Sequence, residues 1–244
     1  MIFYLGTHRI NHCQHFARVF VSVNILRNRK ADFLANNWIM DSGAFTELSR
    51  FGEYRWPVEE YAGHIDRWKD CGNLELAVSQ DYMCEPFILA KTGLTIRQHQ
   101  KLTIERYEAL VSLTDVAIMP VLQGYHVQDY INHLGMYADR LEYGAYIGIG
   151  SVCKRNGNPQ EIIRILEAIK GERPDLKLHG FGLKLTSLAN LYLISLLESA
   201  DSMAWSYAAR RQGRDPNSLD EATKFLTRLS SIQGQKPAQL RLVI

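Results

Sequence analysis

The chain has 244 residues, of which 46% are hydrophobic and 22% charged, and its formal net charge is +2 at pH 7. Such a chain is long enough to bury one large core, and its net charge by itself implies no polyanionic partner. It has neither an apolar run of about 18 residues nor a basic segment followed by an apolar signal core. We therefore expect one domain over residues 1–244, in a soluble cytoplasmic protein without membrane contact.

The basic residues are unevenly distributed. Residues 1–31 contain no acid but several basic side chains, namely Arg9, Arg18, Arg27, Arg29 and Lys30. A second group follows Asp201 and consists of Arg210, Arg211 and Arg214. Two interpretations stay open: a solvated surface, which is the simpler one for any single side chain, or a rim that binds phosphate groups.

The cysteines and histidines lack the spacing of a metal site. The four cysteines, which are Cys13, Cys71, Cys84 and Cys153, lie far apart and form no Cys-x-x-Cys pair. This pattern predicts reduced thiols and favours neither zinc nor a disulfide framework. His8, His12 and His179 are assigned to packing or hydrogen bonding. We expect no metal and no cofactor.

Short apolar or β-branched runs recur along the chain at intervals too long for hairpins. They predict eight strands, at 2–5, 19–23, 38–40, 76–79, 116–122, 146–149, 178–181 and 202–205. Pro120 falls inside one of these runs, which is compatible with a strand margin. The connection between the first two strands is too short and irregular to assign.

Segments of helical period lie between several of these strands. Helices are predicted at 58–69, 95–112, 127–137, 159–170, 187–198 and 219–229. The helix at 159–170 has the clearest start, because Asn158, Pro159 and Glu161 read as an N-cap, a first-turn proline and a partial capping box. The alternation of strand and helix predicts a parallel sheet, and eight strands favour a single (β/α)8 TIM-type barrel over a doubly wound open sheet.

Polar residues follow the predicted strands at the point where each strand ends. They are Asp41, Asp81, Gln123, Ser151 and Lys184. In a barrel this end carries the active site. One aspartate at such a position more often caps a helix or pairs with a lysine. Three aspartates, which are Asp41, Asp81 and Asp201, indicate a shared site. The glycines near Gly148 and Gly150 permit close approach of a planar ligand and are weak evidence alone.

Short motifs in a fixed order resemble those of the tRNA-guanine transglycosylase superfamily. They are DSGAF at 41–45, QDY at 80–82, LQG at 122–124, GIGS at 148–151, HGFG at 179–182 and DSMAWSYAAR at 201–210. By this resemblance Asp201 is the nucleophile that attacks the anomeric carbon, and Asp41 is the general acid and base. Asp81 and Gln123, with Ser42 and the backbone of Gly148 and Gly150, would bind the base.

These implied roles agree with the chemistry. Displacing a base from a sugar develops oxocarbenium character, which one carboxylate can trap covalently while a second moves protons. Asp and Gln side chains offer the in-plane acceptors and donors that a base edge requires. A barrel without catalytic activity that only binds a modified base is the least favoured alternative, because such a protein needs no paired carboxylates.

Departures from the family pattern favour its DNA-directed branch. The zinc-binding CxCxxC segment is absent, no RNA-binding domain follows the barrel, and Cys153-Lys154-Arg155 replaces the usual glycine-glutamate step. This branch includes deazaguanine DNA transglycosylases and related anti-phage DNA glycosylases. DNA is the expected partner, with its target base flipped out of the duplex. Phosphates would be held by Arg9, Lys154, Arg155, Arg210 and Arg211.

The sequence barely separates two outcomes for the covalent intermediate. Water would release it and leave an abasic site, or a 7-deazaguanine base would replace the guanine that was lost. The lone domain and the missing glycine-glutamate step favour removal of a base, which we expect to be a modified base and which would suit anti-phage defence. Base exchange is the alternative. A tRNA-directed transglycosylase that borrows a partner's RNA-binding surface is the second alternative. The oligomeric state is left open.

Overall fold

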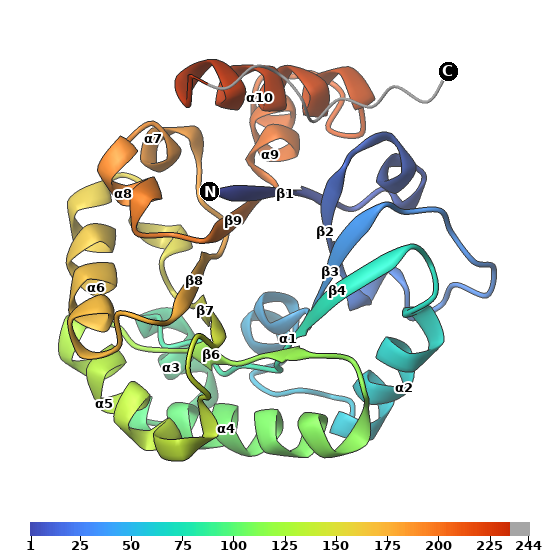
Figure 1. The fold of residues 1–244 in the computed structure, drawn as a ribbon. Coiled ribbons are helices and arrows are strands. Elements are labelled where there is room, and N and C mark those ends of the chain that lie inside the picture. Colours follow the sequence, from blue (N-terminus) through green and yellow to red (C-terminus); the bar gives the residue numbers. More distant parts are fainter. Residues whose placement is uncertain (235–244) are drawn as a thin grey trace.

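The computed structural model describes residues 1–234 and shows parallel strands arranged as a ring with helices outside it (Figure 1). The strands follow the order β5-β4-β3-β2-β1-β9-β8-β7-β6. Their bounds are β1 Ile2–Thr7, β2 Arg18–Ser22, β3 Asn37–Asp41, β4 Asn73–Val78, β5 Ile118–Met119, β6 Val121–Leu122, β7 Tyr146–Ile149, β8 Lys177–Gly180 and β9 Ser199–Ser202. The predicted TIM-type barrel is confirmed.

The ring closes through β5 and β6, which are one short segment interrupted by Pro120. β5 pairs with β4, and β6 pairs with β7. Tyr137 supports the interruption, because its hydroxyl accepts from the Val121 N–H at 3.3 Å and donates to the Val121 carbonyl at 3.1 Å. The carbonyl of Pro120 still accepts from the Gly148 N–H at 2.8 Å. The run predicted as one strand at 116–122 is therefore two short strands.

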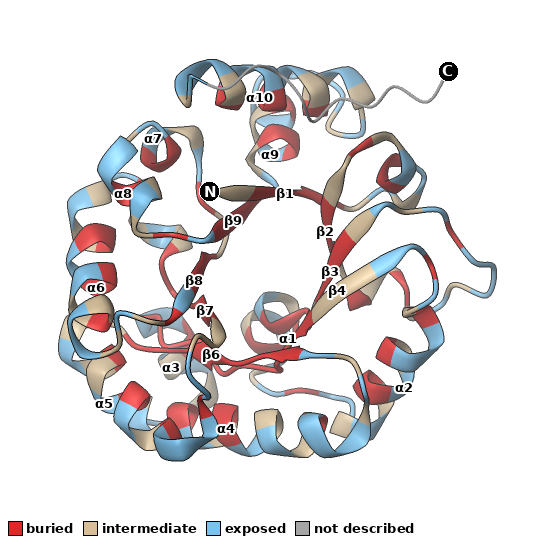
Figure 2. Ribbon diagram, in the orientation of Figure 1, coloured by how far each residue is buried: buried red, intermediate tan, exposed pale blue. Residues whose placement is uncertain are grey.

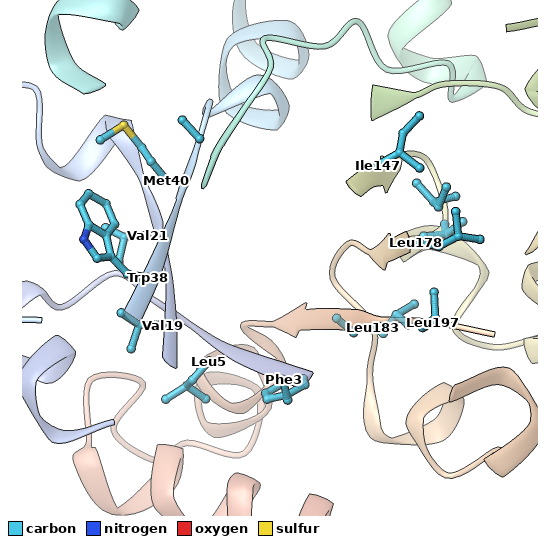
Figure 3. Packing of buried hydrophobic residues seen from close by; sticks show 14 of the residues in the cluster. Phe3, Leu5, Val19, Val21, Trp38, Met40, Ile147, Leu178, Leu183 and Leu197 are labelled. Atoms are coloured by element: carbon cyan, nitrogen blue, oxygen red, sulfur yellow. The ribbon is translucent and has the colours of Figure 1, made fainter. Parts of the chain in front are cut away.

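Alternation along the strands separates two apolar layers. Inside the barrel lie Tyr4, Phe20, Ile39, Val78, Met119 and Val121. The residues between them, such as Leu5, Val21 and Met40, pack outward in the layer under the helices (Figure 3). Because successive side chains of a strand point to opposite faces, Asp41 lies on the same side of β3 as Ile39, toward the barrel axis.

The helices surround the ring with their buried faces toward the strands (Figure 2). They are α1 Ala44–Phe51, α2 Val58–Trp68, α3 Pro86–Thr92, α4 Ile96–Leu113, α5 Val127–Tyr137, α6 Pro159–Glu172, α7 Leu185–Leu188, α8 Leu191–Ser195, α9 Ala204–Arg211 and α10 Leu219–Ile232. The helices predicted at 58–69, 95–112, 127–137, 159–170 and 219–229 are confirmed. Thr95 forms a full capping box with Gln98 at the start of α4.

The first two strand connections contain short 3-10 helices instead of α-helices. These are η1 Ile10–His15 after β1 and η2 Val23–Ile25 after β2. Further 3-10 turns are η3 Ala138–Arg140 and η4 Cys153–Arg155. On the outer face of β1, Phe3 packs against Phe225 of α10 with ring centroids 6.0 Å apart. The C-terminal helix thus covers part of the barrel wall that a helix of the first connection would otherwise shield.

Two predicted elements were placed wrongly. The last strand is Ser199–Ser202 and not 202–205, because α9 already begins at Ala204 and the Ser202 Oγ accepts from its N–H at 3.2 Å. The helix predicted at 187–198 is broken into α7 and α8. The break occurs at Asn190, whose Oδ1 accepts from the Leu193 N–H at 3.0 Å and caps the second helix.

No helix within residues 1–234 combines the length and the apolar character that crossing a membrane requires.

Candidate active site

A cavity of about 270 Å³ opens at the carboxyl ends of the strands. Its wall receives side chains or backbone from β1, β2, β3, β9 and the loops after β4, β6, β7 and β8, including Gly6, Ser22, Asp41, Asp81, Gln123, Gly150, Phe181 and Asp201. The two carboxylates of the predicted chemistry and the two predicted base readers therefore lie in one cavity. This convergence follows from the parallel barrel, in which all strands end on the same face.

Asp41 is the last residue of β3 and faces the cavity. The pKa of its carboxyl is raised from 3.8 to about 6, mainly by burial and also by the charge of Asp201, while hydrogen bonds from Ser22 and from the Gly43 N–H oppose the shift. The Gly43 N–H donates to Asp41 Oδ2 at 3.2 Å. A carboxyl group with a pKa near neutral pH is suited to giving and taking a proton.

Asp81 and Gln123 are joined by a hydrogen bond from the Gln123 amide to Asp81 Oδ2. Burial raises the pKa of Asp81 to about 7, with the Gln123 hydrogen bond opposing that shift and the Asp41 charge adding to it. The backbone of Gln123 is held in turn, because its N–H donates to His133 Nδ1 at 2.8 Å and its carbonyl accepts from Gln100 Nε2 at 2.8 Å. Donor and acceptor groups are thus fixed side by side.

The imidazole of His133 is neutral in this position. Burial lowers its pKa to about 3. Its Nδ1 accepts from the Gln123 N–H, so the proton is on Nε2, which lies 3.1 Å from the carbonyl oxygen of Gln100. The histidine therefore works as a fixed bridge that holds the loop after β6 in place.

Asp201 lies within β9, and its side chain accepts two hydrogen bonds on one oxygen. The Gly182 N–H donates to Oδ1 at 3.0 Å, and His179 Nε2 lies 3.3 Å from the same atom. Tyr146 donates to the Ser199 hydroxyl, which lies 2.5 Å from His179 Nδ1. When Ser199 donates to Nδ1, the Nε2–H of His179 faces Asp201. These bonds orient the carboxylate through its Oδ1.

Two of the predicted base-binding residues do not line the cavity. Ser42 is fully buried behind β3, and Gly148 lies inside the barrel beside Phe181. A Cβ atom at position 148 would come within 2.3 Å of the Phe181 ring. Gly150 does line the cavity, and a Cβ there would lie 2.1 Å from Gln123 Nε2. Glycine at 150 therefore leaves room for the Gln123 amide.

The predicted phosphate-binding residues fall into two groups. Arg9, Lys154, Arg210 and Arg211 are exposed. The side chain of Arg155 is only 12% exposed, because it pairs with Glu161 at 2.9 Å and donates to the Tyr125 carbonyl. Arg155 therefore holds the loop after β7 together, whereas the other four cations are free of such enclosure.

Several residues of the mouth were not singled out from the sequence. His179 was assigned only to packing or hydrogen bonding, yet it contacts Asp201. Phe45 and Phe87 are exposed by 49% and 46%, and Lys154 Nζ lies 5.2 Å and 5.4 Å from their ring centroids. Alternation along β8 could have placed His179 inward, but no local pattern brings residues 45, 87 and 154 together.

Nothing within residues 1–234 groups three or more His, Cys, Asp or Glu side chains in an arrangement that could hold a metal ion.

The fold and the cavity together define a class of protein. It is a TIM-type barrel whose mouth combines paired carboxylates with a buried polar pair of the kind that reads a base edge. A family model described as DpdA, DeoxyPurine in DNA protein A, matches residues 1–226. The chain belongs to this family of DNA-modification enzymes, which are similar to tRNA-guanine transglycosylase and act on DNA bases through glycosyl transfer. A search of curated proteins found no match to the chain.

Proposed function

We propose that this protein exchanges guanine in DNA for a 7-deazaguanine base through a covalent intermediate between Asp201 and deoxyribose. The observation that carries the proposal is the meeting of Asp41, Asp201 and the Asp81–Gln123 pair in one cavity. Membership of the DpdA family favours base exchange over the base removal that the sequence alone favoured.

In the first step Asp201 Oδ2 attacks C1′ of the target nucleotide and forms an ester-like bond to the sugar. The bond between C1′ and N9 breaks, and its electron pair leaves with the base. Asp41 in its protonated form supplies the proton that makes the departing guanine neutral. His179 and the Gly182 N–H hold the attacking carboxylate in position throughout.

In the second step the incoming base reverses these events. Asp41, now a carboxylate, removes the N9 proton of the 7-deazaguanine base, and N9 attacks C1′. The bond to Asp201 breaks and returns the electron pair to that carboxylate. Two displacements retain the configuration of the sugar, and Asp41 ends protonated, as it began.

One reading pair serves both bases, because replacing N7 by carbon leaves the carbonyl, N1–H and 2-amino groups of guanine unchanged. The Gln123 amide would donate to the carbonyl oxygen, and the Asp81 carboxylate would accept from the ring N–H. The backbone of Gly150 would complete the wall beside them. Ser42 and Gly148 would act indirectly, by shaping the strands that carry these groups.

The target base has to leave the duplex to enter a cavity of this size, which costs a few kcal/mol. Arg9, Lys154, Arg210 and Arg211 are the exposed cations that would hold the flanking phosphates. The exposed rings of Phe45 and Phe87 beside Lys154 offer surfaces on which neighbouring bases can stack.

The proposal is tested by incubating the protein with DNA and a labelled 7-deazaguanine base, and analysing DNA and free bases by mass spectrometry. Incorporation of the label with release of an equal amount of guanine supports base exchange. Abasic sites without incorporation would show a glycosylase. Bulk tRNA in a parallel reaction tests the tRNA-directed alternative, and Asp201→Asn is the matched control that removes the nucleophile in each case.

A further inference from the structure

The hydroxyl of Ser151 stands between two acceptor groups. Its Oγ lies 2.9 Å from Gln123 Oε1 and 3.0 Å from Glu85 Oε2, and it accepts from the Cys84 N–H at 3.2 Å. Ser151 is 5% exposed and has a left-handed backbone, with φ of 57°. The fold therefore holds a buried serine in an unfavourable conformation at the point where the reading amide is supported.

The number of protons limits how these bonds are made. A serine hydroxyl has one proton, so it can donate to Gln123 or to Glu85, but not to both. In the contact to which the hydroxyl does not donate, the partner residue must supply the proton and Ser151 must accept it. Glu85 supplies one when it is a neutral carboxylic acid, and Gln123 supplies one when its amide is turned around.

Two complete arrangements follow, and in each of them one of the two carboxyl groups, Glu85 or Asp81, is protonated. In the first, neutral Glu85 donates to Ser151, Ser151 donates to Gln123 Oε1, and the Gln123 amide donates to an Asp81 carboxylate. In the second, ionised Glu85 accepts from Ser151, and the turned Gln123 amide donates to Ser151. Gln123 Oε1 then accepts from a protonated Asp81. The two arrangements present opposite polarity to a bound base.

The surroundings of Glu85 favour its neutral form. The residue is 2% exposed, and its Oε1 has no hydrogen-bonding partner among the residues that the structure describes. Burial raises the pKa of Glu85, although hydrogen bonding from Ser151 and the charges of Lys154 and Arg155 oppose the shift. A buried carboxylate oxygen without a partner is far more unfavourable than the same oxygen in a neutral acid.

We propose that Glu85 and Ser151 are positioning residues that orient the Gln123 amide, so that the cavity selects a base with a carbonyl oxygen next to a ring N–H. This inference rests on the proposed function, because it assumes that Gln123 and Asp81 read the base. Ser151 lines the cavity and Glu85 does not, and both act on the base through the Gln123 amide. Glu85 and Ser151 set the direction of the hydrogen bonds that run through Gln123 to Asp81, and this direction determines which base the cavity binds.

The test compares guanine with 2,6-diaminopurine, which keeps the 2-amino group but reverses donor and acceptor at positions 6 and 1. Affinities of both free bases are measured by calorimetry for the wild-type protein and for Glu85→Gln, Glu85→Met and Ser151→Gly. Gln and Met have similar length, but only Gln can donate to Ser151. Glycine at 151 removes the hydroxyl and tolerates the positive φ.

We expect wild type and Glu85→Gln to prefer guanine, and Glu85→Met and Ser151→Gly to lose about tenfold of that preference, the value of one net hydrogen bond. The thermal midpoint of each variant is measured in parallel. An unchanged preference in Glu85→Met, or an equal loss in the Gln and Met variants, would overturn the proposal. A wild-type protein without any base preference would instead contradict the reading role of Asp81 and Gln123.

Discussion

The three aspartates of the cavity differ in what surrounds each carboxyl group. Asp201 has its Oδ1 held by a backbone N–H and a histidine, which suits the nucleophilic role that we propose for it. Asp41 and Asp81 lie where burial raises their pKa to about 6 and about 7. Burial thus penalises the charged form of Asp41 and Asp81, and the roles that we propose for the three aspartates follow their different surroundings.

Replacing Asp81 by Asn should stabilise the protein at neutral and alkaline pH. The pKa of Asp81 in the folded protein, about 7, lies above its ordinary value of 3.8, so its favourable contribution to stability is present below about pH 4 and is lost as the pH rises through 7. Relative to wild type, the free energy of unfolding of Asp81→Asn should rise by roughly 2 to 4 kcal/mol between pH 4 and pH 8. Denaturant titrations at both pH values measure this difference, and a constant difference would contradict the raised pKa.

Replacing Asp201 by Asn should abolish turnover with little effect on folding. Asn keeps the shape and an oxygen that accepts from the Gly182 N–H, but its amide is not a nucleophile. We expect turnover to fall by about 10⁴-fold or more, with no covalent protein–DNA adduct on a denaturing gel. Asp201→Ala is the contrasting variant. It leaves two buried donors unpaired and should lower the stability by about 1 to 3 kcal/mol.

At the scale of elements, β5 and β6 are short strands of two residues each, separated by Pro120. Pro120 removes one N–H from the strand, and Tyr137 from α5 supplies the partner for both polar groups of Val121. Gln123, which reads the base in our proposal, lies directly after this segment. Support by a helix side chain therefore substitutes for regular strand pairing just below the site.

Replacing Tyr137 by Phe tests this support. The ring keeps its packing, but the Val121 N–H and carbonyl lose their shared partner, which should reduce the free energy of unfolding by about 1 to 3 kcal/mol. Tyr107→Phe is the control, since this tyrosine packs edge-on against Tyr137 at a centroid distance of 5.8 Å and lies outside the strand segment. Equal effects of the two variants in urea titrations would argue against a special role of Tyr137.

Helix α9 connects β9, the strand that contains Asp201, to a basic surface. It begins just after β9 and ends in Arg210 and Arg211, both exposed. Charge reversal at these two arginines should weaken DNA binding and reduce the slope of log affinity against log salt by about 2. Arg164→Glu on the outer helix α6 is the matched control and should leave the slope unchanged. Equal binding by all variants at low salt would remove Arg210 and Arg211 from the DNA footprint.

At the scale of the whole molecule, the parallel barrel explains why residues from 41 to 201 form one site. Every strand ends on the same face, so an inward side chain at each end reaches the same cavity. The C-terminal helix α10 packs on β1 through Phe225 and Phe3, and thus completes the outer layer where the first connections lack α-helices. Phe20 and Val78 of the inner apolar layer line the cavity.

The amino-acid sequence by itself determined the barrel, the helices α2, α4, α5, α6 and α10, and the places of Asp41, Asp81, Gln123 and Asp201 near the strand ends. Strand alternation and helical period are local patterns, and the ordered motifs mark the strand ends. It did not predict the strand at Ser199–Ser202, because its residues SADS are not an apolar run and become buried only by pairing with β1 and β8. Nor did it predict the two short helices around Asn190.

Only the tertiary structure decided which polar groups share a cavity and which of them are buried. The contact of His179 with Asp201 joins neighbouring strands, and the contacts of Ser151 join residues that are 28 and 66 positions apart in the chain. The structure also shows that Arg155 is not an exposed cation, because its side chain pairs with Glu161 and donates to the Tyr125 carbonyl. Hydrogen-bond direction and burial depend on neighbours in space, and so a linear pattern cannot encode them locally.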